Sequence, residues 1–172
     1  LTAAEKECSR LLAEKEELVR NIEKKTAEYL LSGAIPGISD VGGDWVILGL
    51  ARGNRLSSSF RKGYYENVVK TLRATGSEKL HRSKSTENSR VILALTSLGY
   101  DASDIAGYNL LAPLADFSYV KKQGLNGSIW ALIAFDSAEY TIPKVTGGTE
   151  GAQQTTREAL LQEILSCQLS SG

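Results

Sequence analysis

A short apolar phrase occurs three times along the chain and constrains the fold more than any other feature of the sequence. It reads Ile47-Leu48-Gly49-Leu50, then Ile92-Leu93-Ala94-Leu95, then Ile129-Trp130-Ala131-Leu132. Each copy lies in the centre of a segment whose apolar residues have helical spacing, and each has a small residue in the third place. The copies are 45 and 37 residues apart, the length of one helical hairpin, so they predict stacked pairs of helices.

The overall charge gives no global attraction to nucleic acid or to lipid, because twenty basic and twenty acidic residues cancel in a chain of 172 residues. Basic residues nonetheless gather between Arg52 and Lys84, where they exceed the acidic ones by seven. The simplest interpretation is a solvated helix face and loop, and the alternative is a surface for an anionic partner. No apolar run is long enough for a membrane span, so none is expected.

The two cysteines, Cys8 and Cys167, lie far apart in the sequence and form no metal-binding or redox motif. Their redox state stays open. The first residues contain neither an initiating methionine nor the basic-then-apolar pattern of a signal peptide. We therefore expect the chain to be a piece of a longer protein.

The first helix is expected over residues 2–32. The simplest interpretation is a packing helix with one solvent-facing side. A coiled-coil seam is the alternative, against which Lys15 and Lys25 count because they occupy seam positions. The apolar stripe that predicts the helix recurs at steps of three and four residues: Ala4, Cys8, Leu11, Leu18, Ile22 and Tyr29.

Six further helices follow from capping residues and apolar spacing. Those that carry the repeated phrase are apolar on nearly all sides, whereas the intervening ones are amphipathic. An inner layer covered by an outer layer explains this alternation. We expect Gly49, Ala94 and Ala131 to let neighbouring inner helices approach closely. The expected helices are 43–52, Ser58 or Ser59 to Gly76, Ser85 or Thr86 to Gly99, Pro113 to Gly124, 126–138 capped by Asn126, and one opened by a capping box at 155–158.

Together these elements predict one all-α domain over residues 1–172, in which the long helix 1–32 precedes helical-hairpin repeats at 41–76, 85–124 and 126–169. Five segments carry a resemblance to a known superfamily: Asp44–Gly53, Glu87–Arg90, Leu95–Asp101, Gly107–Leu110 and Asn126–Asp136. They resemble the prenyltransferase/squalene-oxidase-type repeats of the terpenoid cyclase and protein prenyltransferase superfamily, in particular those of Gram-positive bacterial cell-surface proteins. The resemblance covers residues from about 41 to 172.

The resemblance implies an α/α-toroid, and seven helices would form only the N-terminal part of a barrel that needs about a dozen. It also implies a secreted or cell-surface location. The motifs of the family's catalytic members are not found, however. Asp101–Asp104 lacks the adjacent acids of an Asp-x-Asp-Asp run, His81 and the two cysteines do not match the zinc-ligand pattern, and Cys167-Gln168 does not supply a thioester sequence. We therefore expect no catalytic residue, no metal and no cofactor in this chain.

The candidate site consists of polar and aromatic residues at the starts of the inner helices. In a toroid these ends line a funnel, where a Trp face and an Arg side chain suit a mixed polar and apolar ligand. Ordinary helix capping is the alternative interpretation. The candidate ligand-binding residues are Asp44, Trp45, Asn88, Arg90 and Asn126.

The expected function is non-catalytic ligand binding or adhesion. The ligand would be a small amphipathic molecule or a protein partner at the concave face or at the open edge of the toroid, including a second copy or the rest of the toroid. A terpenoid-cyclase-like or prenyltransferase-like enzyme whose catalytic residues lie outside this chain is one alternative. A spacer domain without any ligand is another.

Overall fold

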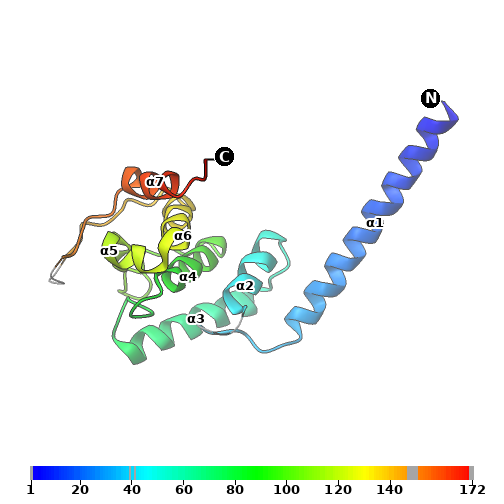
Figure 1. Ribbon diagram of the computed structural model, residues 1–172. Helices are drawn as coiled ribbons and strands as arrows, with labels where there is room; N and C mark the ends of the chain where they lie inside the picture. Colours follow the sequence, from blue (N-terminus) through cyan, green and yellow to red (C-terminus); the bar gives the residue numbers. More distant parts are fainter. Residues whose placement is uncertain (1, 39, 41, 147–150, 171–172) are drawn as a thin grey trace. The chain divides into compact units, whose positions relative to one another are not determined.

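The computed structural model describes residues 2–38, 40, 42–146 and 151–170, which fold into helices joined by loops (Figure 1). Within these residues the backbone forms no β-strand beyond two isolated bridges, so the prediction of an all-α fold is confirmed. The chain forms two compact units, Leu1–Ile35 and Pro36–Gly172.

The first unit is built on a single long helix, α1 (Ala3–Leu31), close to the expected bounds. Thr2 and Glu5 close its first turn as a capping box, in which each side chain accepts a hydrogen bond from the other residue's backbone N–H. Every described residue from position 2 to position 26 is exposed, and Leu18 keeps 61% of its surface in contact with solvent. Within its own unit, α1 therefore buries none of this stripe.

The second unit is organised around the three helices that carry the repeated phrase, α2 (Gly43–Arg52), α4 (Ser85–Ser97) and α6 (Gly124–Asp136). Helix α4 packs against both α2 and α6, and α7 (Arg157–Ser166) packs against α6 (Figure 1). The five consecutive residues from Val91 to Leu95 are all buried, so α4 is covered on every side. Of the three helices, α4 is the one buried as expected of an inner helix, whereas α2 and α6 keep exposed apolar residues, Trp45 and Ile133.

The close helix contact occurs at a different glycine from the one expected. Gly49 is exposed, and a Cβ built on it would meet nothing within 4 Å, because α2 buries only the opposite face with Ile47 and Leu50. A Cβ on Gly127 of α6 would instead lie 2.1 Å from the backbone oxygen of Val120. The expected role of Gly49 is thus wrong.

Helix α3 (Ser58–Thr75) precedes α4 and has the predicted amphipathic stripe, with Phe60, Tyr64 and Leu72 among its buried residues. It ends at Gly76, whose φ of 61° lies in the left-handed region that favours glycine, as expected. Its N-cap is Ser57, one residue before the two serines proposed for this role.

The single helix expected from Pro113 to Gly124 is broken into three short pieces. These are a 3₁₀ turn η1 (Ala112–Ala115), a helical turn α5 (Phe117–Val120) and a second 3₁₀ turn η2 (Lys121–Gln123). Asp116 interrupts them with an extended backbone. The interruption has a tertiary cause, because the backbone on either side of Asp116 bonds to the segment 153–155: Phe117 donates to the Gln153 oxygen and Ala115 accepts from the Thr155 N–H.

Three predicted N-caps are also wrong. Helix α4 starts after Lys84, while the hydroxyl of Ser85 donates to the backbone oxygen of Val120 and that of Thr86 to the side chain of Gln123. These groups bond to a neighbouring segment rather than to the amides of their own helix.

The starts of α6 and α7 also differ from expectation. Helix α6 begins at Gly124, so Asn126 lies inside its first turn and does not cap it. Helix α7 is capped by Thr156, whose side chain accepts from the Ala159 N–H. Thr155 is buried and donates to the Leu114 oxygen, so the predicted capping box does not form.

Candidate functional site

The first turns of the three inner helices meet at two adjoining hollows. One, here called the Asp44 hollow, has a volume of about 390 Å³; the other, here called the tryptophan hollow, has a volume of about 180 Å³. Trp45 and Arg90 line both. The Asp44 hollow is completed by Asp40, Gly42, Gly43, Asp44, His81, Lys84 and Glu87, and the tryptophan hollow by Thr86, Gln123, Asn126 and Trp130.

Four of the five candidate residues, Asp44, Trp45, Arg90 and Asn126, therefore line the hollows. The fifth, Asn88, does not, because its side chain is fully buried and its amide is used inside the fold. Asn88 accepts from the Leu80 N–H and donates to the backbone oxygens of Glu78 and Leu110, at distances of 3.1, 2.7 and 3.1 Å. These bonds hold the connector before α4 in place, which is a structural role.

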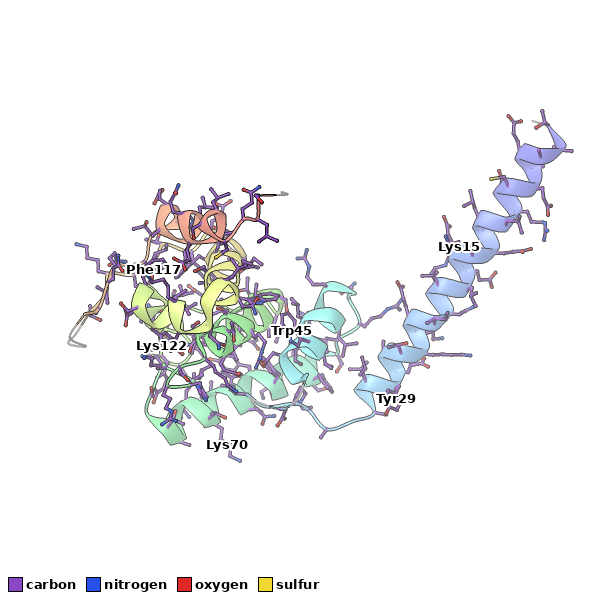
Figure 2. The ribbon with its side chains drawn as sticks, in the orientation of Figure 1. Lys15, Tyr29, Trp45, Lys70, Phe117 and Lys122 are labelled. Carbon is purple, nitrogen blue, oxygen red and sulfur yellow. The ribbon has the colours of Figure 1, made fainter. Side chains whose placement is uncertain are left out.

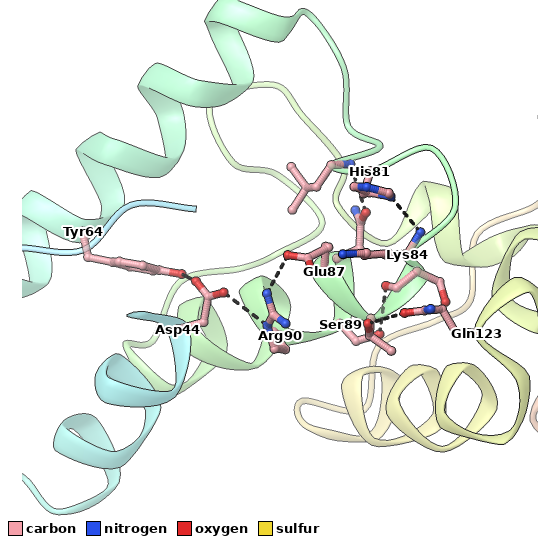
Figure 3. Close-up of polar contacts among 12 residues, drawn as sticks. Asp44, Tyr64, His81, Lys84, Glu87, Ser89, Arg90 and Gln123 are labelled. Carbon is pink, nitrogen blue, oxygen red and sulfur yellow. Dashed lines mark hydrogen bonds and ion pairs between the residues drawn. The ribbon is translucent and has the colours of Figure 1, made fainter. Parts of the chain in front are cut away.

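A chain of polar contacts runs under the Asp44 hollow and joins three helices (Figure 3). The Tyr64 hydroxyl of α3 donates to Asp44 of α2 at 2.7 Å, and the other carboxylate oxygen of Asp44 lies 3.4 Å from Nε of Arg90. Arg90 also pairs with Glu87, one turn earlier on α4. Two carboxylates thus fix the guanidinium at the rim, where it retains 25% exposure.

Burial dominates the electrostatics of Asp44, which is only 2% exposed. Removal of the carboxylate from water raises the pKa of Asp44, although the hydrogen bond from Tyr64 and the charge of Arg90 act against this rise. Burial, together with the negative charge of Asp44, raises the pKa of the Tyr64 hydroxyl. Tyr64 therefore remains a neutral donor and cannot serve as a base at ordinary pH.

The two tryptophans, which are the only ones in the chain, lie in contact at the tryptophan hollow. Their ring centroids are 5.0 Å apart and their planes are tilted by 58°. Trp45 projects from α2 (Figure 2) and keeps 40% of its surface exposed. An exposed indole beside a second one offers an apolar wall to a ligand.

Sequence reasoning missed Trp130 as a lining residue because it occupies the second place of the repeated phrase and was assigned to the core. Trp130 lies one helical turn after Asn126, and that spacing puts both side chains on one face of α6. The spacing was the signal that could have found it.

His81 and Lys84 also belong to the Asp44 hollow and were not among the candidates. Nδ1 of His81 accepts hydrogen bonds from the backbone N–H groups of Ser83 and Lys84, at 3.1 and 3.0 Å, and so closes the turn that leads into α4. The lone pair of Nδ1 is thus occupied by the backbone.

Metal-ligating groups do not gather at this site. In the part of the chain that the structure describes, no three His, Cys, Asp or Glu side chains lie close enough together to hold a metal ion. Cys8 and Cys167 are both exposed and carry free thiols. Among the described residues, no helix is long and apolar enough to span a membrane.

A separate and larger hollow of about 780 Å³ lies between the end of α6 and the start of α7. Arg157 lines it and donates from Nε to Asp136 at 2.8 Å and from Nη2 to the backbone oxygen of Tyr140 at 3.0 Å. These bonds use the Arg157 side chain to join the two helices.

In comparisons with known proteins, no family model, curated protein or solved structure matches the chain.

Proposed function

We propose that Pro36–Gly172 is a non-catalytic binding domain that takes a small, uncharged amphipathic ligand in the tryptophan hollow and the Asp44 hollow. The observation that carries this proposal is the exposed face of Trp45 in contact with Trp130, surrounded by amide, hydroxyl and charged side chains. A ligand with one flat apolar face and several hydrogen-bonding groups would be complementary to such walls.

Charge in the Asp44 hollow supports an uncharged ligand. Three carboxylates, those of Asp40, Asp44 and Glu87, line it beside the cationic side chains of Lys84 and Arg90. Arg90 is already paired with two of these carboxylates. An anionic ligand would have to displace those contacts, whereas hydroxyl or amide groups would bond to side chains that stay in place.

The fold that we propose around this site is the N-terminal part of an α/α-toroid, as the resemblance to prenyltransferase-like repeats implies. Its support is the order of the inner helices, since α4 packs against both α2 and α6 and the first turns of all three line the same pair of hollows. A secreted or cell-surface location follows from the resemblance alone and is part of the same proposal.

Native mass spectrometry of the purified chain tests for a retained ligand, and tryptophan fluorescence then measures its binding. Because both tryptophans of the chain line the hollow, the whole indole signal reports on this site. Trp45→Ala should abolish retention, and Asn126→Ala should weaken it, since Asn126 is exposed at the rim.

Tyr29→Ala is the matched control, because Tyr29 is an aromatic residue with 77% exposure on α1, outside the second unit. It should bind as the wild type does. A ligand that remains bound equally well to Trp45→Ala and Asn126→Ala would place binding elsewhere and refute the proposed site.

A further inference from the structure

Helix α1 carries a coiled-coil register that the binding site does not use, with lysines at two of its eight seam positions. Eight positions follow one another at alternating steps of four and three residues, the spacing of the a and d positions of a heptad. The a positions are Cys8, Lys15, Ile22 and Tyr29, and the d positions are Ala4, Leu11, Leu18 and Lys25. The register extends over nearly the whole helix.

The apolar members of this seam are open to solvent. Leu11, Leu18 and Ile22 are 52%, 61% and 55% exposed, and Leu12 and Val19 at neighbouring e positions are 54% and 45% exposed. Figure 2 shows Lys15 and Tyr29 projecting from the helix. An isolated helix gains little stability in water, so a 29-residue helix with an exposed apolar stripe requires a partner surface.

We propose that this partner is a second copy of the chain, and that two α1 helices pair as a parallel, in-register, two-stranded coiled coil. The residues that flank the seam favour a second copy as the partner and a parallel orientation of the two helices. The g positions hold Glu7, Glu14, Asn21 and Glu28, and the e positions hold Glu5, Leu12, Val19 and Thr26.

In a parallel pair each g residue faces the e residue five positions later on the other helix, so Glu7 and Glu14 face Leu12 and Val19. No like charges then meet along the flanks. In an antiparallel pair the g column faces itself, which brings Glu7 opposite Glu28. The flanking positions therefore favour the parallel arrangement, in which Lys15 and Lys25 each face their own copy across the seam at a cost in stability.

The lysine at the second a position fits the same arrangement. In a parallel pair Lys15 is flanked by Glu14 of the other helix, and a single Lys at an a position sets register and favours two strands at a cost in stability. A lipid surface is a less suitable partner for this helix. Helix α1 carries six basic and seven acidic residues, whereas membrane-surface helices are rich in basic ones.

Cys8 allows a direct test of direction and register in the full chain. In an in-register parallel pair the two Cys8 side chains face each other across the seam, within disulfide range. Oxidised glutathione would accept the two electrons and two protons of the thiols, yielding one interchain disulfide and two molecules of glutathione. Cys167→Ser, which keeps Cys8, should become a covalent dimer on a non-reducing gel.

The matched control moves the thiol to the opposite face of the helix. The triple variant Cys8→Ser, Cys167→Ser, Ala13→Cys places it at an exposed f position and should remain uncrosslinked under the same conditions. A noncovalent dimer in which Cys8 does not crosslink would overturn the parallel arrangement.

Sedimentation of the reduced full chain tests the interface itself. Leu18→Glu at a d position should raise the dimer dissociation constant about a hundredfold or more. Ala13→Glu at the f position should leave it unchanged, and Lys25→Leu at a d position should lower it. A wild-type chain that stays monomeric at its highest soluble concentration, or a dimer that Leu18→Glu leaves intact, would overturn the proposal.

Discussion

At the residue scale, the pH dependence of stability should report the burial of Asp44. Because burial raises the pKa of Asp44, the folded chain holds this proton more tightly than the unfolded chain does. The resulting stabilisation is complete below the unfolded pKa of about 3.9 and is lost as the pH rises through the higher folded pKa. The wild type should therefore lose stability relative to Asp44→Asn as the pH rises.

Urea unfolding over a series of pH values measures this difference. Asp136→Asn is the control, since Asp136 pairs with Arg157 at the surface and is not buried. If the difference in the free energy of unfolding between the wild type and Asp44→Asn stays constant across the series, burial does not raise the pKa of Asp44 as expected.

Substitution of Asn88 and Asn126 should change stability to different extents, although both residues were predicted to bind ligand. Asn88→Ala leaves the Leu80 N–H and two carbonyl oxygens without their partner, so it should lower the free energy of unfolding by about 2–3 kcal/mol. Asn126→Ala at the exposed rim should change it by less than about 0.5 kcal/mol. Chemical denaturation distinguishes the two, and a mild effect of Asn88→Ala would contradict the structural role.

At the element scale, substitution of two helix glycines distinguishes a closely packed position from an open one. Gly127→Ala places a Cβ against the Val120 oxygen, so it should destabilise the fold by about 3 kcal/mol as α6 moves away from the preceding turn. Gly49→Ala has open space in mid-helix and should stabilise by about 0.5–1 kcal/mol. Thermal unfolding of both variants is the measurement, and a destabilising Gly49→Ala would contradict the open environment on α2.

Element positions could be predicted from the sequence where the deciding interactions are local. Helix α2 has its predicted bounds and α3 ends at Gly76, because apolar spacing and a left-handed glycine are properties of neighbouring residues. The predicted N-caps Ser85 and Thr155 are wrong because their hydroxyl groups have distant partners. Ser85 bonds to the backbone oxygen of Val120, and Thr155 bonds to that of Leu114. The spacing of residues along the chain gives no sign of those bonds.

The candidate site could likewise be predicted only where local features of the sequence determine it. The three helix starts could be identified from the repeated phrase, and their side chains do line common hollows. Asn88 could not be separated from them, because its three bonding partners lie eight, ten and 22 residues away. His81 enters the hollow through a loop whose path depends on those bonds.

At the scale of the whole molecule, the two compact units should prove separable in their roles. The core of the second unit is formed by side chains of its own helices, among them Ile92, Leu95 and Phe135, all with no exposed surface. A chain shortened to start at Gly33, which keeps Ile35 and Pro36, should therefore unfold at the same temperature as the full chain and give the same tryptophan fluorescence.

The shortened chain should differ from the full chain only in its state of association. Without α1 it lacks the coiled-coil seam, so sedimentation should find a monomer at concentrations where the full chain is a dimer. Its affinity for any ligand of the tryptophan hollow should stay unchanged, since every lining residue is retained. A fall in the unfolding temperature on shortening would mean that α1 stabilises the second unit directly. A shortened chain that still dimerises would instead locate the association surface among the helices from α2 to α7.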